Sequence, residues 1–327
     1  MRCFWDERQR AHAPQTEFFN GALHPAADVP ERVDSVLSAI GKVEIPPRHS
    51  EAELMALLRP VHDANYLDLL RTAHDEWRSA GREGDVLPYA FPVHRRPRSL
   101  ARIDARLGQH AYDTCAPIMV GTWGALLAGL DTLLAALDAT LAGEHAFALT
   151  RPPGHHAGPD YMGGYSYLNW AAIAAILSGK RAAILDLDYH HGNGTEDIVR
   201  GRDGIAFASI HADPATDYPF YWGHAEDSGG NVLNLPLPRG TGFEAYDSAL
   251  SRAAEWLGDG SPEIVIVSFG ADTFVDDPIS HFSLQTADYA RLAERVASLG
   301  VPTLIILEGG YAVEALGGNV ASFLSAF

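Results

Sequence analysis

Short apolar runs alternate with longer amphipathic segments along the second half of the chain. The apolar runs have the length of buried strands, and the segments between them show helical periodicity. The predicted strands are 1–6, 145–150, 182–187, 205–210, 263–269 and 302–307, and the predicted helices are 31–40, 62–81, 168–177, 195–200, 243–256, 286–299 and 315–326. Continuous apolar strands separated by helices are typical of a parallel sheet covered on both faces. The pattern therefore predicts an α/β fold, although 327 residues permit either one large domain or two ordinary ones.

One segment, residues 82–107, departs from this alternation. It contains Pro88, Pro92 and Pro97 and the basic cluster His94-Arg95-Arg96. We expect a loop or insertion here, and long loops of this kind are often functional or form interfaces.

The sequence favours a cytoplasmic protein over a membrane or secreted one. The most apolar long stretch, 117–143, is interrupted by Asp131 and Asp138, which predicts an amphipathic or buried helix rather than a membrane span. The first residues show no apolar run of signal-peptide length. The cysteines, Cys3 and Cys115, give no disulfide framework and fit a reducing compartment as apolar fillers.

Polar motifs follow four of the predicted strands directly. They are Arg-Pro-Pro-Gly-His-His at 151–156, Asp-Leu-Asp-Tyr-His-His at 186–191, Gly-Ala-Asp at 270–272 and Glu-Gly-Gly-Tyr at 308–311. Ligands of parallel α/β sheets bind at the carboxyl ends of the strands. We therefore expect these motifs, distant in sequence, to meet at one rim of the sheet.

The Asp-Leu-Asp-Tyr-His-His motif at 186–191 predicts a metal site. Because side chains alternate along extended backbone, Asp188 and His190 face the same side, and Asp272 can supply a third ligand. One imidazole and two carboxylates, with a fourth position left to water, are typical of catalytic zinc. Asp186 faces the same way and either orients a neighbouring imidazole or binds a monovalent cation with nearby carbonyls. The alternative is that the motif only caps a strand and the next helix.

Three further groups fit proton transfer and charge stabilisation. His155 and His156 are suited to general base and general acid work near neutral pH. Tyr311 can donate a hydrogen bond to a developing oxyanion. The alternative is that these are ordinary structural side chains.

Other residues are candidates for a narrow substrate tunnel. The Gly163-Gly164-Tyr165 motif offers the carbonyl of Gly164 to a substrate amide N–H and the ring of Tyr165 as one wall. Tyr218 and Ile279 are candidates for the opposing walls. Core packing explains each wall residue nearly as well.

The negative net charge argues against nucleic acid as a partner. There are 24 Lys plus Arg against 42 Asp plus Glu, a formal net charge of −18. Such a field repels nucleic acid and steers cationic molecules inward, although surplus carboxylates also simply keep a protein soluble.

Taken together, these motifs resemble the histone deacetylase-like amidohydrolases of the arginase–deacetylase superfamily. The matching strings lie at 151–156, 163–165, 186–195, 270–274 and 308–311, and the resemblance spans essentially the whole chain. It implies a single domain over residues 1–327, with three layers in α/β/α order around a mostly parallel sheet.

The resemblance also implies roles for individual residues. Asp188, His190 and Asp272 would bind zinc, or iron in the cell, and His155, His156 and Tyr311 would be catalytic. Asp186 would support His155, and Asn193 would support His156. The positions that match a structural potassium site of the family are Asp186, Ser209 and the backbone of Asp188, His190 and Ile210.

Within that family the chain looks most like the acetylpolyamine amidohydrolases, on the Thr16-Glu17 region and the 82–107 segment. That likeness implies a homodimer in which 82–107 narrows the tunnel, and a small cationic N-acetylated amine as substrate. Glu17 and Asp104 would meet its distal ammonium groups. Two alternatives remain. One is another enzyme activity, the deacylation of acetyl-lysine in peptides or of other small amides. The other is a catalytically inactive protein of the same fold that binds acylated amines. A dinuclear arginase-like centre fits less well, because the motifs supply few ligands for two ions.

Overall fold

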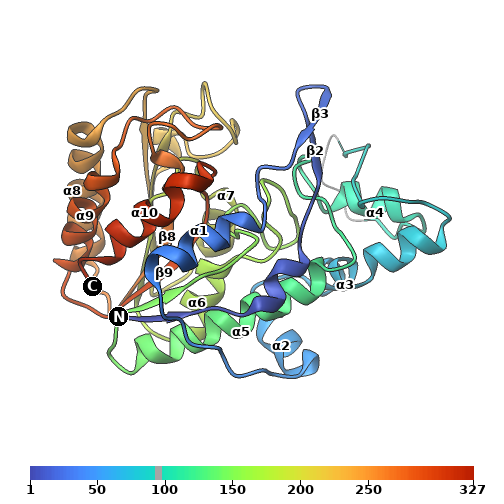
Figure 1. Ribbon diagram of the computed structural model, residues 1–327, viewed down its shortest axis with the longest axis horizontal. Helices are drawn as coiled ribbons and strands as arrows, with labels where there is room; N and C mark the ends of the chain where they lie inside the picture. The colour runs from blue at the N-terminus through green and yellow to red at the C-terminus, as the bar shows by residue number, and fades with distance from the viewer. Residues whose placement is uncertain (93–97) are drawn as a thin grey trace.

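A seven-stranded parallel sheet runs through the centre of the computed structural model, which describes residues 1–92 and 98–327 (Figure 1). The strand order is β1-β4-β9-β8-β5-β6-β7, and every neighbouring pair is parallel. The strands are β1 (Arg2–Phe4), β4 (Ala146–Ala148), β5 (Ala182–Asp186), β6 (Ile205–Ala212), β7 (Val232–Leu237), β8 (Ile264–Phe269) and β9 (Thr303–Leu307). The predicted single α/β domain with a parallel sheet is confirmed.

Helices pack on both faces of this sheet. One face is covered by α5 (Thr122–Leu141), α6 (Trp170–Ser178) and α7 (Asn193–Val199), and the other by α1 (Glu31–Ile40), α8 (Phe243–Asp259), α9 (Thr286–Ala297) and α10 (Val313–Leu324). The side chains of β5 alternate between the two cores: Ile184 packs on the first face, and Ala183 and Leu185 on the second. This alternation makes the sheet the middle of three layers.

The remaining elements include α2 (Glu51–Leu58), α3 (Ala64–Ser79), α4 (Ile103–Gln109) and an antiparallel hairpin of β2 (Thr16–Phe19) and β3 (Ala22–Pro25). Among them, α3, α4 and the hairpin lie at the right of Figure 1, and α2 lies below α5. Three short 3₁₀ helices, η1 (Glu7–Ala11), η2 (Ala225–Asp227) and η3 (Ala271–Thr273), complete the described part of the chain.

The prediction of an irregular segment at 82–107 is partly wrong. Its last residues form the start of α4, where Ile103 and Leu107 are buried in the first core. Val86 is also ordered, because it forms a bridge to Ile118 on the other side of the insertion. The basic cluster His94-Arg95-Arg96 lies outside the described residues.

The apolar stretch 117–143 forms α5, as predicted. The helix has the length and composition to cross a membrane, yet 72% of its most apolar window is buried inside the protein. Asp131, in the middle of this helix, is buried and forms an ion pair with Arg8 at 2.7 Å. These contacts make α5 a core helix.

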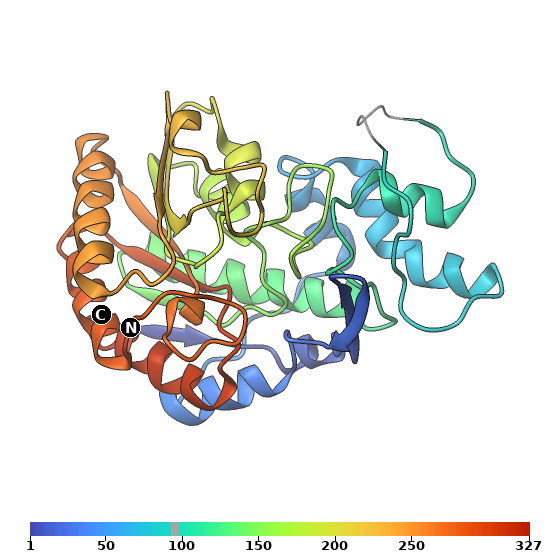
Figure 2. The same cartoon turned by 90° about the horizontal axis from the view of Figure 1, so that it is seen from above.

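The topology brings the four polar motifs together. β5 and β8 are neighbours, β8 also pairs with β9, and β9 pairs with β4. Because the strands are parallel, the segments that follow each of them leave from the same edge of the sheet, which is seen from above in Figure 2. The predicted convergence is confirmed.

Candidate active site

A buried cluster of two aspartates and one histidine lies at this rim. His190 Nδ1 is 3.2 Å from Asp188 Oδ1 and 3.0 Å from Asp272 Oδ2, and one ligand atom from each residue lies within 4.8 Å of the others. Asp188 and His190 follow β5, while Asp272 sits in η3 directly after the neighbouring strand β8. The arrangement fits the predicted metal triad.

The chemistry of this donor set fits a divalent first-row ion. Among the described residues, no lysine or arginine forms an ion pair with Asp188 or Asp272. Burial and the nearby charge of Asp188 raise the pKa of Asp272, so the two carboxylates repel each other when both are ionised. Two hard oxygens and one imidazole nitrogen at this spacing suit zinc or ferrous iron, and a bound ion would relieve that repulsion.

Gly309 lets the chain pass close to these carboxylates. Its N–H donates to Asp188 Oδ2 at 2.8 Å. A Cβ at this position would lie 2.5 Å from Asp188 Oδ2 and 2.7 Å from Asp272 Oδ2, closer than any real side chain allows. Glycine is therefore required here by the metal-ligand carboxylates themselves.

The tandem histidines lie beside the triad, in the loop after β4. The two imidazole rings are 4.0 Å apart, and both are buried. His155 Nδ1 pairs with Asp186 Oδ2 at 3.0 Å, and His156 Nδ1 pairs with Asn193 Oδ1 at 2.7 Å. These are the partners that the sequence predicted, a carboxylate for the first histidine and a neutral amide for the second.

Different partners move the two imidazole pKa values in opposite directions. Burial alone would lower the pKa of His155, but Asp188 and Asp186 together outweigh burial and raise it to about 10. Burial lowers the pKa of His156 well below 6.5, and the charges of His155 and His190 lower it further. His156 is therefore the neutral imidazole of the pair.

Tyr311 completes the rim from the turn after β9. Its phenol is buried, which raises its pKa well above the ordinary value and keeps the hydroxyl proton in place. The ring packs 5.5 Å from that of Tyr165, and the Arg32 guanidinium lies 4.7 Å from its centre on the other side. A protonated phenol fixed beside a metal triad can donate to a developing oxyanion.

Two of the wall candidates, Tyr218 and Gly164, lie beside His156. Tyr218 packs edge-on against His156, with 5.1 Å between ring centres, and lies 5.9 Å from His190. Ile279 is half-buried in the turn that follows η3. Gly164 has φ +49°, and a Cβ there would lie 2.3 Å from His156 Cδ2, so the loop can approach the histidine only as glycine. Its carbonyl accepts a long bond of 3.3 Å from Ser166 Oγ.

Asp113 is a site residue that the sequence analysis missed. Its Oδ2 accepts the Gly164 N–H at 2.8 Å and the Tyr218 hydroxyl at 2.7 Å, which ties two tunnel segments together. No periodicity or motif marks this residue, because its partners lie 51 and 105 positions away.

A buried ion network beneath Tyr311 was also missed. Arg32 donates to the carbonyls of Gly310 at 2.7 Å and Glu308 at 2.6 Å, and pairs with Asp28 at 2.6 Å. Asp28 also pairs with Arg151 at 3.0 Å. The Asp28 carboxylate thus pairs with two guanidinium groups, and Arg32 holds the turn before Tyr311 through its backbone carbonyls.

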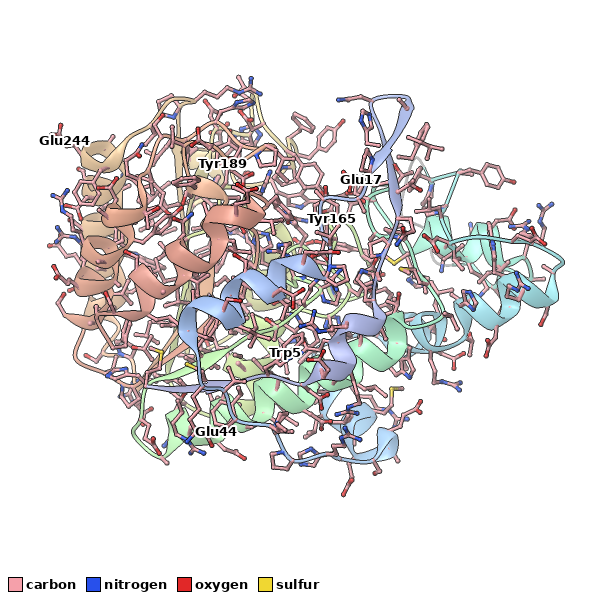
Figure 3. The ribbon with its side chains drawn as sticks, in the orientation of Figure 1. Trp5, Glu17, Glu44, Tyr165, Tyr189 and Glu244 are labelled. Atoms are coloured by element: carbon pink, nitrogen blue, oxygen red, sulfur yellow. The ribbon has the colours of Figure 1, made fainter. Side chains whose placement is uncertain are left out.

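The two residues expected to meet distal ammonium groups have different surroundings. Glu17 is buried and shares a hydrogen bond with the phenol of Tyr165, and Figure 3 shows the two labelled residues close together. Asp104, in contrast, already forms ion pairs with Arg82 at 3.1 Å and Arg102 at 2.7 Å. Its carboxylate is therefore neutralised within the chain and is not free for an ammonium group, contrary to the expectation.

The expected potassium residues lie side by side without a direct bond. Asp186 and Ser209 occupy the same register in β5 and β6. Ser209 Oγ, however, pairs with His211 Nδ1 at 2.9 Å, and Asp186 Oδ1 accepts the Asp188 N–H at 3.1 Å.

A metal triad, an imidazole pair and a phenol at the carboxyl rim of a parallel sheet define a hydrolytic metalloenzyme site. Comparison with known proteins gives the same class. Residues 26–327 match the model of the histone deacetylase domain. The chain therefore belongs to the histone deacetylase family and is an amidohydrolase.

Individual relatives place it near one branch of that family. It is 42% identical to acetylpolyamine amidohydrolase 1 of Pseudomonas aeruginosa, over 100% of this chain and 99% of the relative. It is 40% identical to the acetylpolyamine amidohydrolase of Mycoplana ramosa, over 99% and 98% of the two chains. The crystal structure of acetylpolyamine aminohydrolase from Burkholderia pseudomallei superposes with a TM-score of 0.94 at 34% identity, covering 100% and 98% of the chains.

Proposed function

We propose that this enzyme is a zinc-dependent hydrolase of acetylated polyamines or similar small N-acyl amines, releasing acetate and the free amine. The observation that carries this proposal is the juxtaposition of the Asp188, His190 and Asp272 triad with the His155–His156 pair. Full-length relatives named acetylpolyamine amidohydrolases support the choice of substrate.

The triad would hold the metal ion, which when bound polarises the amide carbonyl and lowers the pKa of a water molecule. His156 is neutral, so it can take a proton from the attacking water and pass it to the leaving amine nitrogen. His155 is fixed by Asp186, which favours its protonated form, and a protonated His155 would stabilise the negative charge that builds up during attack. Tyr311 donates its phenol proton in a hydrogen bond to the carbonyl oxygen as that oxygen becomes negative.

The structure also supports a cationic substrate. Glu17 Oε2 is buried and has no hydrogen-bond partner among the described residues, although Tyr165 binds the same carboxylate. A buried carboxylate with an unused oxygen beside a tunnel wall is stabilised by an ammonium group. The net charge of −18 would steer such a substrate inward.

Three further features belong to this proposal by resemblance to the family. The segment 82–107 would form a homodimer and narrow the tunnel mouth, and potassium would bind near Asp186 and Ser209. The enzyme would act in the cytoplasm. Sedimentation of the full chain beside a variant with 88–99 replaced by a short glycine linker tests the dimer, because only the variant should sediment as a monomer.

The substrate is tested by comparing kcat/KM for acetylputrescine, acetylspermidine and acetyl-lysine peptides at defined zinc or iron content. Higher kcat/KM for the acetylated polyamines supports the proposal, and a preference for the peptides would replace it with acetyl-lysine deacetylation. Tight binding of acetylated amines without any product would indicate a binding protein instead.

A further inference from the structure

Asp277 lies in the turn after η3 and uses its whole carboxylate to hold backbone N–H groups. Oδ2 accepts from Tyr311 at 2.7 Å and from Ala312 at 3.2 Å. Oδ1 accepts from Ile279 at 3.1 Å. The side chain is only 6% exposed, and among the described residues no lysine or arginine forms an ion pair with it.

The turn that ends in Tyr311 is held at several backbone groups, and Asp277 is the side chain that binds the N–H groups of Tyr311 and Ala312. Gly309 and Gly310 precede Tyr311, and Gly310 has φ +120°, a conformation that side chains other than glycine rarely adopt. Gly309 is itself fixed, because its N–H donates to Asp188 Oδ2 at 2.8 Å and its carbonyl accepts from the Ala271 N–H at 3.0 Å. Arg32 holds the carbonyl side of this turn through Gly310, so Asp277 supplies the opposing anchor on the N–H side.

One carboxylate thus joins two parts of the tunnel. Its Oδ2 fixes the phenol-bearing residue, and its Oδ1 fixes the wall residue Ile279 two positions along its own turn. Bonds from N–H groups to an ionised carboxylate are among the stronger hydrogen bonds in proteins. A shift of the Tyr311 backbone therefore requires breaking its hydrogen bond to Asp277, which restrains the position of the residue that carries the phenol.

We propose that Asp277 is a positioning residue for the reaction: it holds Tyr311 where its phenol meets the substrate oxygen. This inference rests on the proposed function, in particular on the role of Tyr311. It adds a carboxylate that touches neither metal nor substrate and acts through the backbone of a residue that does.

The first test is Asp277→Asn. An asparagine has the same shape but only one oxygen acceptor. Its NH2 group must therefore face either the Ile279 N–H or the N–H groups of Tyr311 and Ala312. The hydrogen bonds on that side are lost. A misplacement of about 1 Å at a reacting group lowers turnover by roughly 100-fold. We expect kcat to fall by between about 10-fold and 100-fold, with KM and bound metal changed much less.

The decisive measurement repeats the substitution in a Tyr311→Phe background. If Asp277 acts through the phenol, removal of the hydroxyl leaves nothing to position, and Asp277→Asn should then change kcat less than about twofold. A general loss of structure would instead lower kcat by the same factor in both backgrounds, and that outcome overturns the inference. Unchanged kcat for Asp277→Asn alone overturns it as well.

Two further variants serve as a control and as a replacement for Asp277→Asn. Asp276→Asn makes the same change at the exposed neighbouring aspartate and should match the wild type in kcat. Asp277→Ser replaces Asp277→Asn in the same cycle if the latter does not fold. Full turnover by Tyr311→Phe would refute the proposed function together with this inference, whereas a slow Tyr311→Phe with a fast Asp277→Asn refutes the inference alone.

Discussion

Glu308 accepts the backbone N–H of Gly154 at 2.6 Å through its Oε2 atom. The same oxygen accepts from His155 at 3.2 Å, and Oε1 accepts from Ser268 Oγ at 3.0 Å. Glu308 begins the turn that ends in Tyr311, so one buried side chain sets the tandem-histidine loop relative to the phenol. This relationship leads to the first prediction.

Glu308→Ala should lower kcat strongly, whereas Glu308→Gln should retain most of it. A glutamine oxygen can accept both N–H groups while its NH2 donates to the hydroxyl of Ser268, but alanine leaves the buried N–H groups without an acceptor. The measurement is kcat at saturating substrate with metal content recorded. Equal loss in both variants would mean that the negative charge of Glu308, rather than its hydrogen bonds, supports the reaction.

Removal of the metal should abolish hydrolysis. Chelator-treated enzyme should be inactive and should recover on addition of zinc or ferrous iron. Asp272→Asn should lower both bound metal and turnover, because it removes one of the anionic ligands. Asp203→Asn, at an exposed turn, is the matched control and should behave as wild type. Hydrolysis that survives complete chelation would refute the metal mechanism.

Tyr311→Phe should lower kcat by about 100-fold to 1,000-fold, the usual cost of losing one oxyanion donor. The ring contacts with Tyr165 and Arg32 do not use the hydroxyl, so folding and metal binding should be preserved. Steady-state kinetics beside metal analysis gives the answer. A change in KM alone would assign the phenol to substrate binding instead.

Asn193→Asp should move the acidic limb of the kcat/KM profile to higher pH. A carboxylate at His156 Nδ1 stabilises the imidazolium and raises the pKa of His156, which in the native protein is held low by burial and by His155 and His190. A general base works only when unprotonated, so the variant needs a higher pH to reach its full rate. An acidic limb that stays in place or moves to lower pH would argue against His156 as the base.

His62 should make folding stability sensitive to acid. Burial lowers its pKa to about 4, against about 6.5 when unfolded. Between these values the unfolded chain binds the extra proton, so stability falls as pH falls, by up to about 1.4 kcal/mol per pH unit. His62→Gln removes this contribution, and its deficit relative to wild type in denaturant titrations should shrink from pH 7 to pH 5. A constant deficit would contradict this, and His281→Gln at an exposed position is the control.

Much of the fold could be predicted because the buried strands are continuous apolar runs. β7 was missed because Asn234 and Pro236 interrupt its apolar pattern, and a proline is tolerated there since β7 is the edge strand of the sheet. Two other missed elements did carry local signals. Asn20-Gly21, with both residues at positive φ, forms the turn of the β2–β3 hairpin, and Ser50 with Glu53 forms a capping box at the start of α2.

The residues of the candidate site also fall into two groups, those that the sequence predicted and those that it did not. The candidate metal triad and its histidines could be predicted because each stands in a polar motif directly after a predicted strand, and parallel strands bring such motifs to one edge of the sheet. Asp113, Asp277 and Arg32 act on residues 34 to 278 positions away, and no local pattern encodes such pairs. For Asp104, the family resemblance suggested a role near ammonium groups, and no local pattern showed the two arginines that pair with its carboxylate.

The place of β9 in the sheet has a consequence for biosynthesis. β9 lies between β4 and β8, yet it is the last strand to leave the ribosome. Until Thr303–Leu307 emerges, the sheet exists as two separate halves, each with an unpaired edge prone to aggregation, and the rim that unites Asp272 with Tyr311 has not formed. A chain that lacks β9 therefore cannot bring Asp272 and Tyr311 to one rim, and it exposes the edges of β4 and β8.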